Sequence, residues 1–296
     1  MAPDPRIARV GIVAKPGLTA TAVELQAVTA WLDARGVEPI IEHETAAMTG
    51  LTGRRGASRD ELPALVDLIL VFGGDGTLLG MADRIGEADL EIPILGVNFG
   101  TLGFLTEIAA AELLPSLQAA LDGTAVVESR MMLRSNIERA GTAGPDRIVL
   151  NDVAVTGGSL SRIVEFAVSV GGDFVARFNA DGIIISSPTG STAYNLSAGG
   201  PIVHPAVDAF VLNPIAPHAL TNRPLVIPAD ADVTIQPVLQ RPGDEAFVTF
   251  DGQSGEQLQN GDVVRVRRAR RPMRLIRSAD RSYYEVLRTK LRWAER

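Results

Sequence analysis

The sequence of 296 residues contains no cysteine and only three histidines. The lack of cysteine excludes disulfides and thiolate metal sites, and it agrees with an intracellular protein. His43, His204 and His218 lie far apart and lack the close spacing of zinc ligands. No apolar run approaches the ~18 residues of a membrane span, and the first residues lack a signal-peptide pattern. We therefore expect a cytoplasmic protein without a membrane partner or a protein-bound metal.

Charge of one sign is also unevenly placed. The net charge of −7 argues against a general nucleic-acid binder, although basic residues gather over residues 265–296. Apolar residues such as Val264 and Val266 alternate with the arginines there. This alternation favours a solvated strand face over a nucleic-acid site.

The predicted secondary structure changes along the chain from alternating strands and helices to short strands. With 46% hydrophobic residues, the chain can bury two cores. Strand and helix patterns alternate up to Leu121, which predicts an open parallel sheet. From about residue 124, short β-branched runs separated by turns predict an all-β domain. We predict an α/β domain over residues 1–123, a β-sandwich domain over 124–271, and a C-terminal segment over 272–296 that returns to the first domain.

A buried strand pattern at Leu68–Phe72 ends in the motif GGDGT, residues 73–77. Glycines let the backbone approach an anion, and the next segment can start a helix whose free N–H groups point at the same place. This predicts a phosphate-donor loop of Gly73, Gly74, Gly76 and Thr77. Asp75 would repel phosphate, which suggests that it accepts a proton or holds a cation. The alternative is a turn in which Asp75 caps the helix.

Two further stretches surround the predicted strand ends. Asn98–Leu105 is glycine-rich and follows a strand pattern, and its Phe104 could be core or could lie against a ligand. Residues 43–62 are polar and predict a loop, in which Arg54 and Arg55 either reach a phosphate or, as we favour, face water.

Hydroxyl groups crowd residues 186–192, between a strand pattern and a short helix from about Ser191. Hydroxyl and amide donors would gather at that helix start. The alternatives are a merely capped helix, with Tyr194 in the core, and a plain turn for Asn151-Asp152 before the strand at Val153.

GGDGT resembles a signature shared by NAD kinases, lipid kinases of the diacylglycerol type and 6-phosphofructokinases, which leaves the phosphate acceptor open. Further stretches resemble NAD kinases closely, in family order and over nearly the whole chain: NFGTLGFLTE, VLNDVAV, DGIIISSPTGSTAYNLSAGGP, IAPHALTNRP and DGQ. This resemblance implies transfer of the terminal phosphate of ATP or polyphosphate, with Mg²⁺, to the 2′-hydroxyl of the adenosine ribose of NAD. It also implies a homodimer or homotetramer.

The resemblance assigns roles residue by residue. Asp75 matches the general base, with Gly76 beside it, and Asn151 and Asp152 match the pair that holds the adenosine. Most members carry Asn-Glu where Asn151-Asp152 stands, so the negative charge is kept but the side chain is shorter by one methylene group. The other implied NAD contacts are Phe104, Arg162, Asn179, Asp181, Thr192, Ala193, Tyr194, Asn195, Leu196, Ser197, Ala216 and Gln253.

Two rival functions stay open on the sequence. A lipid kinase would share GGDGT, but it would be expected to offer a surface for membranes. A non-catalytic dinucleotide sensor would keep the pocket and lose the base, whereas Asp75 is present. The choice between ATP and polyphosphate, and between NAD and NADH, is not determined by these motifs.

Overall fold

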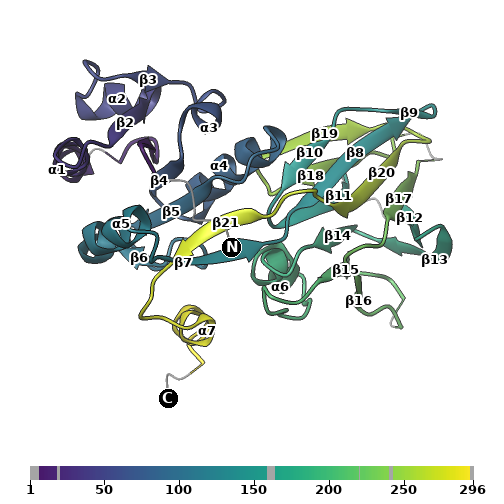
Figure 1. Cartoon of the computed structure of the whole chain (residues 1–296). Coiled ribbons are helices and arrows are strands. Elements are labelled where there is room, and N and C mark those ends of the chain that lie inside the picture. The colour runs from purple at the N-terminus through teal and green to yellow at the C-terminus, as the bar shows by residue number, and fades with distance from the viewer. Residues whose placement is uncertain (1–6, 19–20, 159–163, 220, 240–242, 294–296) are drawn as a thin grey trace. The chain divides into compact units, whose positions relative to one another are not determined.

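The computed structural model describes residues 7–18, 21–158, 164–219, 221–239 and 243–293. The chain forms two compact units, one from Met1–Ser129 together with Met273–Arg296 and one from Arg130–Pro272. The first is an α/β unit around a parallel sheet, and the second is an all-β sandwich (Figure 1). The fold class expected from the sequence is thereby confirmed.

The sheet of the first unit has the order β3-β2-β1-β4-β5-β21-β7, with β6 paired to β5. Every residue of β4 is buried, as the continuous apolar run predicts for a central parallel strand. The strands are β1 (Arg9–Ala14), β2 (Glu38–Glu42), β3 (Gly56–Ala57), β4 (Leu68–Phe72), β5 (Pro93–Asn98), β6 (Ile108–Ala109), β7 (Val126–Arg130) and β21 (Met273–Arg277).

Helices cover both faces of this sheet. The apolar sides of α1 and α5 share one core with alternate residues of β1, β4 and β5. On the other face, α3 packs at Gly11 and α4 packs at Gly96, where glycine leaves room for Leu62 and Leu78. The helices are α1 (Ala22–Asp33), α2 (His43–Thr49), α3 (Leu62–Leu65), α4 (Asp75–Glu87), α5 (Leu113–Leu121) and α7 (Tyr283–Leu291), with a 3₁₀ turn at Ala110–Glu112.

The segment 43–62 contains α2, β3 and the start of α3, so the expectation of a polar loop was wrong. The Glu42 carboxylate caps α2 by accepting the N–H groups of Glu44 and Thr45, a local signal hidden by the polar composition. Arg54 pairs with Asp33 at 2.7 Å and Arg55 with Glu38 at 3.3 Å. Both arginines therefore face carboxylates.

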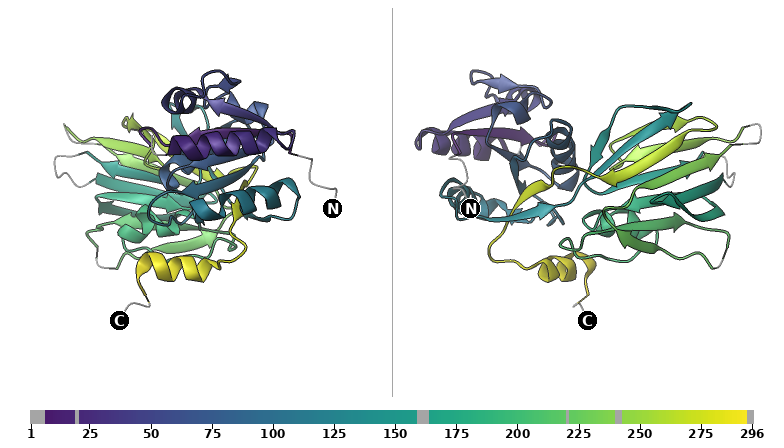
Figure 2. Two further views of the ribbon diagram at one scale, coloured as in Figure 1. Left: turned by 90° about the vertical axis from the view of Figure 1, so that its left-hand side faces the viewer. Right: turned by 45° about the vertical axis from the view of Figure 1, so that its right-hand side comes forward.

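The C-terminal segment returns to the first unit, as expected. Its strand β21 lies between β5 and β7, the yellow ribbon beside the teal one in Figures 1 and 2. Because β7 pairs with β21, residues 124–129 belong to the first unit, although their β-branched texture had placed them in the second domain.

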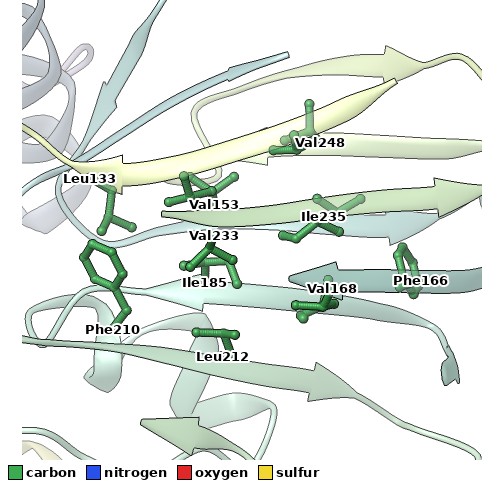
Figure 3. Close-up of a cluster of buried hydrophobic side chains, with 14 of the residues drawn as sticks. Leu133, Val153, Phe166, Val168, Ile185, Phe210, Leu212, Val233, Ile235 and Val248 are labelled. Atoms are coloured by element: carbon green, nitrogen blue, oxygen red, sulfur yellow. The ribbon is translucent and has the colours of Figure 1, made fainter. Parts of the chain in front are cut away.

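The second unit packs a seven-stranded and a six-stranded antiparallel sheet around one apolar core (Figure 3). One sheet holds β10 (Arg147–Val149), β8 (Leu133–Arg139), β20 (Val263–Arg268), β17 (Val233–Val238), β12 (Val164–Val170), β13 (Asp173–Ala180) and β9 (Thr142–Ala143). The other holds β16 (Leu225–Pro228), β15 (Ala209–Ile215), β14 (Gly182–Ser186), β11 (Asp152–Gly157), β18 (Ala246–Phe250) and β19 (Ser254–Leu258).

The strand order of the first unit reverses between β1 and β4. The chain leaves β1 toward β2 and β3 and then returns to β4 on the other side. Ligands of open parallel sheets bind at the carboxyl ends of the strands at such a reversal. GGDGT follows β4 there, and Lys15 follows β1, with its N–H donating to the Phe72 carbonyl at 2.8 Å.

Candidate active site

Asp75 is the first residue of α4, and its carboxylate turns toward the loop after β5. Oδ2 accepts the N–H of Phe104 at 2.9 Å. Oδ1 accepts the N–H groups of Leu105 at 3.1 Å and Thr106 at 2.9 Å, and the Thr106 hydroxyl at 2.9 Å. Gly74 is the N-cap of α4 without a side-chain cap, so Asp75 does not cap the helix as the alternative interpretation required.

The glycines and polar residues of NFGTLGFLTE shape this loop. The Asn98 amide accepts the N–H of Gly100 at 2.6 Å and donates to the Thr101 carbonyl, which turns the chain after β5. A Cβ atom on Gly103 would lie 2.1 Å from Asp75 Oδ1, far inside any real contact. Only glycine therefore lets the loop close over the Asp75 carboxylate.

The phosphate-donor loop meets the carboxyl end of β1. α4 begins two residues earlier than Thr77, and the N–H groups of Thr77 and Leu78 both point back to the Gly74 carbonyl. These two N–H groups are therefore occupied, and the N–H groups that this turn can offer to an anion are those of Asp75 and Gly76, at the positive end of the helix dipole. Lys15 lies against Gly73, where a Cβ would approach Lys15 Cβ at 3.1 Å. In the sequence, Lys15 is only the residue that follows a strand, and no local pattern marks it as a functional residue.

In the second unit, Asp251 organises the connection between β10 and β11. Its carboxylate accepts the N–H groups of Leu150, Asn151 and Asp152, each at 2.8 Å. Its own N–H donates to the Asp152 carbonyl at 3.0 Å. Asp251 adopts a positive φ of 50° in the turn after β18. The sequence singled out Gln253 of this turn but not Asp251, because nothing local identifies the partner.

Asp152 is almost fully buried, with 4% of its surface exposed. Burial, and then the charge of Asp251, raises the pKa of Asp152 to about 7. Its carboxyl group is therefore poised to gain or lose a proton near neutral pH.

The SSPTG turn holds Asn151 from the other side. The Ser187 N–H donates to the Asn151 carbonyl at 2.8 Å, and the Ser187 hydroxyl donates to the Leu150 carbonyl at 2.5 Å. A Cβ on Gly190 would lie 2.2 Å from the Asn151 carbonyl oxygen, so this position requires glycine. Asn151 and Asp152 thus have a tightly specified backbone, which a plain turn would not need.

The helix expected from about Ser191 is broken. A 3₁₀ turn covers Gly190–Thr192, and α6 (Tyr194–Ser197) is a single helical turn. Asn195 is fully buried, and its side-chain amide donates to the carbonyls of Ser191 and Pro201, so this side chain serves the local fold. Tyr194 is 43% exposed, which contradicts the core alternative. Ser197 is exposed, and Thr192, Ala193 and Leu196 are partly exposed.

The remaining residues assigned to NAD come from other elements of the two units. Asn179, Asp181 and Ala216 surround the start of β14, where the Asp181 N–H donates to the Ile215 carbonyl and the His218 N–H to that of Asn179. Asp152, in contrast, pairs with Ser186 at the far end of β14. Gln253 is exposed in the β18–β19 turn. Phe104 is partly buried beneath Lys290, whose ammonium lies 5.6 Å from the ring centre. Arg162 lies outside the described residues.

Among the described residues, no group of three or more His, Asp or Glu side chains could hold a metal ion. Within the same part of the chain, no helix has the length and apolar character needed to cross a membrane.

Comparisons with known proteins identify the family. Residues 10–125 match the model of the ATP-NAD kinase N-terminal domain, and residues 150–278 match that of the ATP-NAD kinase C-terminal domain. An NAD kinase of Geotalea daltonii is 48% identical over 90% of this chain and 92% of its own. That of Syntrophotalea carbinolica is 44% identical over 97% and 99%.

Solved structures share the fold. Yeast NADH kinase complexed with NADH superposes with a TM-score of 0.90 at 23% identity, over 99% of this chain and 89% of its own. An NAD kinase from Archaeoglobus fulgidus in complex with ATP gives 0.74 at 24% identity, over 95% and 99%. Neither the lipid kinase nor the sensor alternative finds support in these matches. The chain belongs to the NAD kinase family.

Proposed function

We propose that this chain transfers the terminal phosphate of ATP or polyphosphate to the 2′-hydroxyl of the adenosine ribose of NAD, with Asp75 as general base. The observation that carries the proposal is the position of Asp75. It stands at the carboxyl end of β4, where the sheet order reverses, and four donors orient its carboxylate.

The two carboxylate oxygens of Asp75 have different tasks in this proposal. Oδ1 has three donors, whereas Oδ2 has one, the Phe104 N–H. A carboxylate oxygen offers about two lone-pair sites, so Oδ2 keeps one for an incoming proton. The 2′-hydroxyl would give its proton to Oδ2 as its oxygen bonds to phosphorus and the bond from phosphorus to the donor's bridging oxygen breaks.

Alignment and charge neutralisation dominate such a reaction. Phosphoryl transfer passes through a loose transition state, and a general base contributes about 10²- to 10⁴-fold. The glycine turn and the first turn of α4 offer N–H groups to the donor phosphates. Lys15 would add a positive charge beside Gly73.

A divalent cation such as Mg²⁺ belongs to the donor in this scheme. Mg²⁺ usually keeps several waters and is held largely by substrate phosphates, so no protein cage is required. This suits the described residues, where no cluster of three acidic or histidine ligands occurs. When bound, the cation would neutralise charge on the transferring phosphate.

Asn151 and Asp152 would hold the adenosine, on a backbone fixed by Asp251 and Ser187. Asn179, Asp181 and Ala216 lie one strand length away, at the other end of β14. At about 3.4 Å per residue, five strand residues span about 17 Å, too far for one adenosine to contact both groups. We propose that this second group contacts the nicotinamide half and that the chain is a homodimer or homotetramer.

The experiment is a direct assay of NADP formation by the purified chain. ATP and polyphosphate are compared as donors, NAD and NADH as acceptors, with and without Mg²⁺, and a dispersed diacylglycerol serves as rival acceptor. Asp60→Asn is the matched carboxylate control, because Asp60 is exposed and pairs only with Arg84 in the residues described. NADP formation that Asp75→Ala lowers by ~10²-fold or more and Asp60→Asn retains supports the proposal. Phosphorylation of the lipid without NADP formation overturns it.

A further inference from the structure

We infer that Glu107 and Arg277 form a positioning pair for Asp75, an inference that rests on the proposed role of Asp75 as base. Glu107 follows Thr106 directly, and Arg277 ends β21, far along the chain. The guanidinium donates from Nε to Glu107 Oε1 at 2.5 Å and from Nη2 to Oε2 at 2.7 Å. The two side chains are 4% and 1% exposed.

The C-terminal segment grips Glu107 by more than this ion pair. The Ser278 N–H donates to Glu107 Oε1 at 2.8 Å, and Arg281 donates to the Glu107 carbonyl at 2.5 Å. Arg277 also donates to Glu128 of β7 at 2.5 Å. Glu107 is thus fixed through its carboxylate and its backbone, by Arg277 at the end of β21 and by Ser278 and Arg281 after it.

One residue separates this anchor from the carboxylate of Asp75. Thr106 gives Asp75 Oδ1 both its N–H and its hydroxyl, each at 2.9 Å. A displacement of Glu107 would therefore move two of the three donors on Oδ1. Rotation of the carboxylate would follow, and with it a shift of Oδ2, the oxygen proposed to receive the proton.

The chemistry of the pair favours positioning over plain stability. A buried ion pair often stabilises a fold no better than well-packed apolar residues of similar volume. A bidentate guanidinium does, however, specify both distance and angle of the carboxylate that it binds. Because misplacement by ~1 Å can cost ~10²-fold in rate, geometry at this point is worth specifying.

Two substitutions test the pair. Arg277→Lys keeps the positive charge but loses the two guanidinium donors that bind both carboxylate oxygens. Glu107→Gln keeps the shape of the side chain but loses its negative charge. We expect kcat for NADP formation to fall about 10-fold or more in each, with KM for NAD within about twofold, because the proposed adenosine contacts lie in the second unit. Rates are referred to the folded fraction from melting curves, and Glu107→Gln serves if Arg277→Lys does not fold.

Arg139→Lys is the matched control. Arg139 binds Asp262 in the same bidentate manner, at 2.7 Å for its closest contact, and Asp262 is 2% exposed. That pair lies in the second unit and includes no residue assigned to the site. The control should lower the melting temperature and leave kcat of the folded enzyme unchanged. An equal loss of kcat in the control would overturn the positioning role.

A double variant separates this inference from the proposed function. If the pair acts through Asp75, Arg277→Lys should cost much less in an Asp75→Ala background than in the wild type, because the group it positions is gone. An undiminished cost in that background, or an unchanged kcat for both single variants, overturns the inference while Asp75 keeps its role. Near-normal turnover of Asp75→Ala overturns both.

Discussion

Asp251 and Asp152 are joined by two hydrogen bonds at the end of the β11–β18 pair, one from backbone to side chain and one from backbone to backbone. The Asp152 N–H donates to Asp251 Oδ1 at 2.8 Å, and the Asp251 N–H donates to the Asp152 carbonyl at 3.0 Å. The Asp251 carboxylate accepts three N–H groups, whereas the Asp152 carboxyl group is buried beside that negative charge. Two carboxyl groups in one buried place make ionisation of Asp152 costly.

The first prediction concerns stability and pH. The pKa of Asp152 rises from its ordinary 3.8 to about 7, so between these values the folded state keeps a proton that the unfolded state has lost. The unfolded state binds fewer protons there, and the free energy of unfolding therefore falls as pH rises, by up to about 1.4 kcal/mol per pH unit. Above pH 7 this contribution levels off.

Asp152→Asn removes this titration and serves as the comparison. Urea unfolding at pH 5, 6, 7 and 8 should show a steeper decline with pH in the wild type than in Asp152→Asn. Groups distant from Asp152 contribute alike to both proteins, so the difference reports the titration of Asp152 together with its coupling to Asp251. Parallel pH profiles would contradict its raised pKa.

The second prediction concerns the grip on NAD. If Asp152 binds the ribose, Asp152→Ala should lower kcat/KM for NAD about 10- to 100-fold at pH 8, where the carboxyl group is ionised, the worth of one or two charge-assisted hydrogen bonds at ~1.5–3 kcal/mol. Asp152→Glu should be tolerated far better, since charge and acceptors are kept. Steady-state kinetics with melting curves alongside measure this. Equal kcat/KM for wild type and Asp152→Ala would remove Asp152 from the site, and leave it a structural turn residue.

The third prediction compares two glycines of one loop. A Cβ on Gly103 would lie 2.1 Å from Asp75 Oδ1, whereas one on Gly100 would meet nothing closer than Asn98 Oδ1 at 3.7 Å. Gly103→Ala should displace the Asp75 carboxylate and lower kcat by about 10²-fold, the scale of a ~1 Å misplacement. Gly100→Ala should keep kcat within about twofold. Similar kinetics for the two variants would mean that closure of the loop over Asp75 is not needed for turnover.

Patterns within a few residues predicted the strands and the glycine loop of the site. Contacts between residues distant in sequence could not be predicted from such patterns. The apolar run of β4 and the glycines after it identified the loop that carries Asp75, because both are read over a few residues. The donors to Asp75 lie 29 to 31 residues away, and their approach depends on Gly103. Asp251 reaches Leu150 across 101 residues, and Arg277 reaches Glu107 across 170. No local pattern marks such partners.

The sequence interpretation was wrong where polar composition was taken as the sign of a loop. Residues 43–62 looked like a loop by composition, yet Glu42 caps α2 and Gly50 ends it in a left-handed conformation. The amide nitrogen of Asn195 also donates inside its turn, and the contact of Asn195 with NAD stays a prediction. Polarity alone does not distinguish a side chain that meets solvent or ligand from one that satisfies the backbone.

The last prediction separates proton acceptance by Asp75 from its hold on the loop. In Asp75→Asn, the amide oxygen can take the place of Oδ1, but the amide nitrogen then meets the Phe104 N–H, donor against donor. The variant loses the proton acceptor and one loop bond, so turnover should fall ~10²-fold or more, with about 1 kcal/mol of stability lost.

Thr106→Val is the counterpart, because it removes the hydroxyl bond to Oδ1 and leaves Oδ2 as it is. Its stability loss should be at least as large, since the hydroxyl also accepts from the Asn98 amide at 3.3 Å, while turnover stays within about 10-fold of wild type. Single-turnover rates of NADP formation and urea unfolding of both variants measure the two quantities. If Thr106→Val slows turnover as much as Asp75→Asn at equal stability, the four bonds around Asp75 matter for placing the loop, and the proton must go to another acceptor.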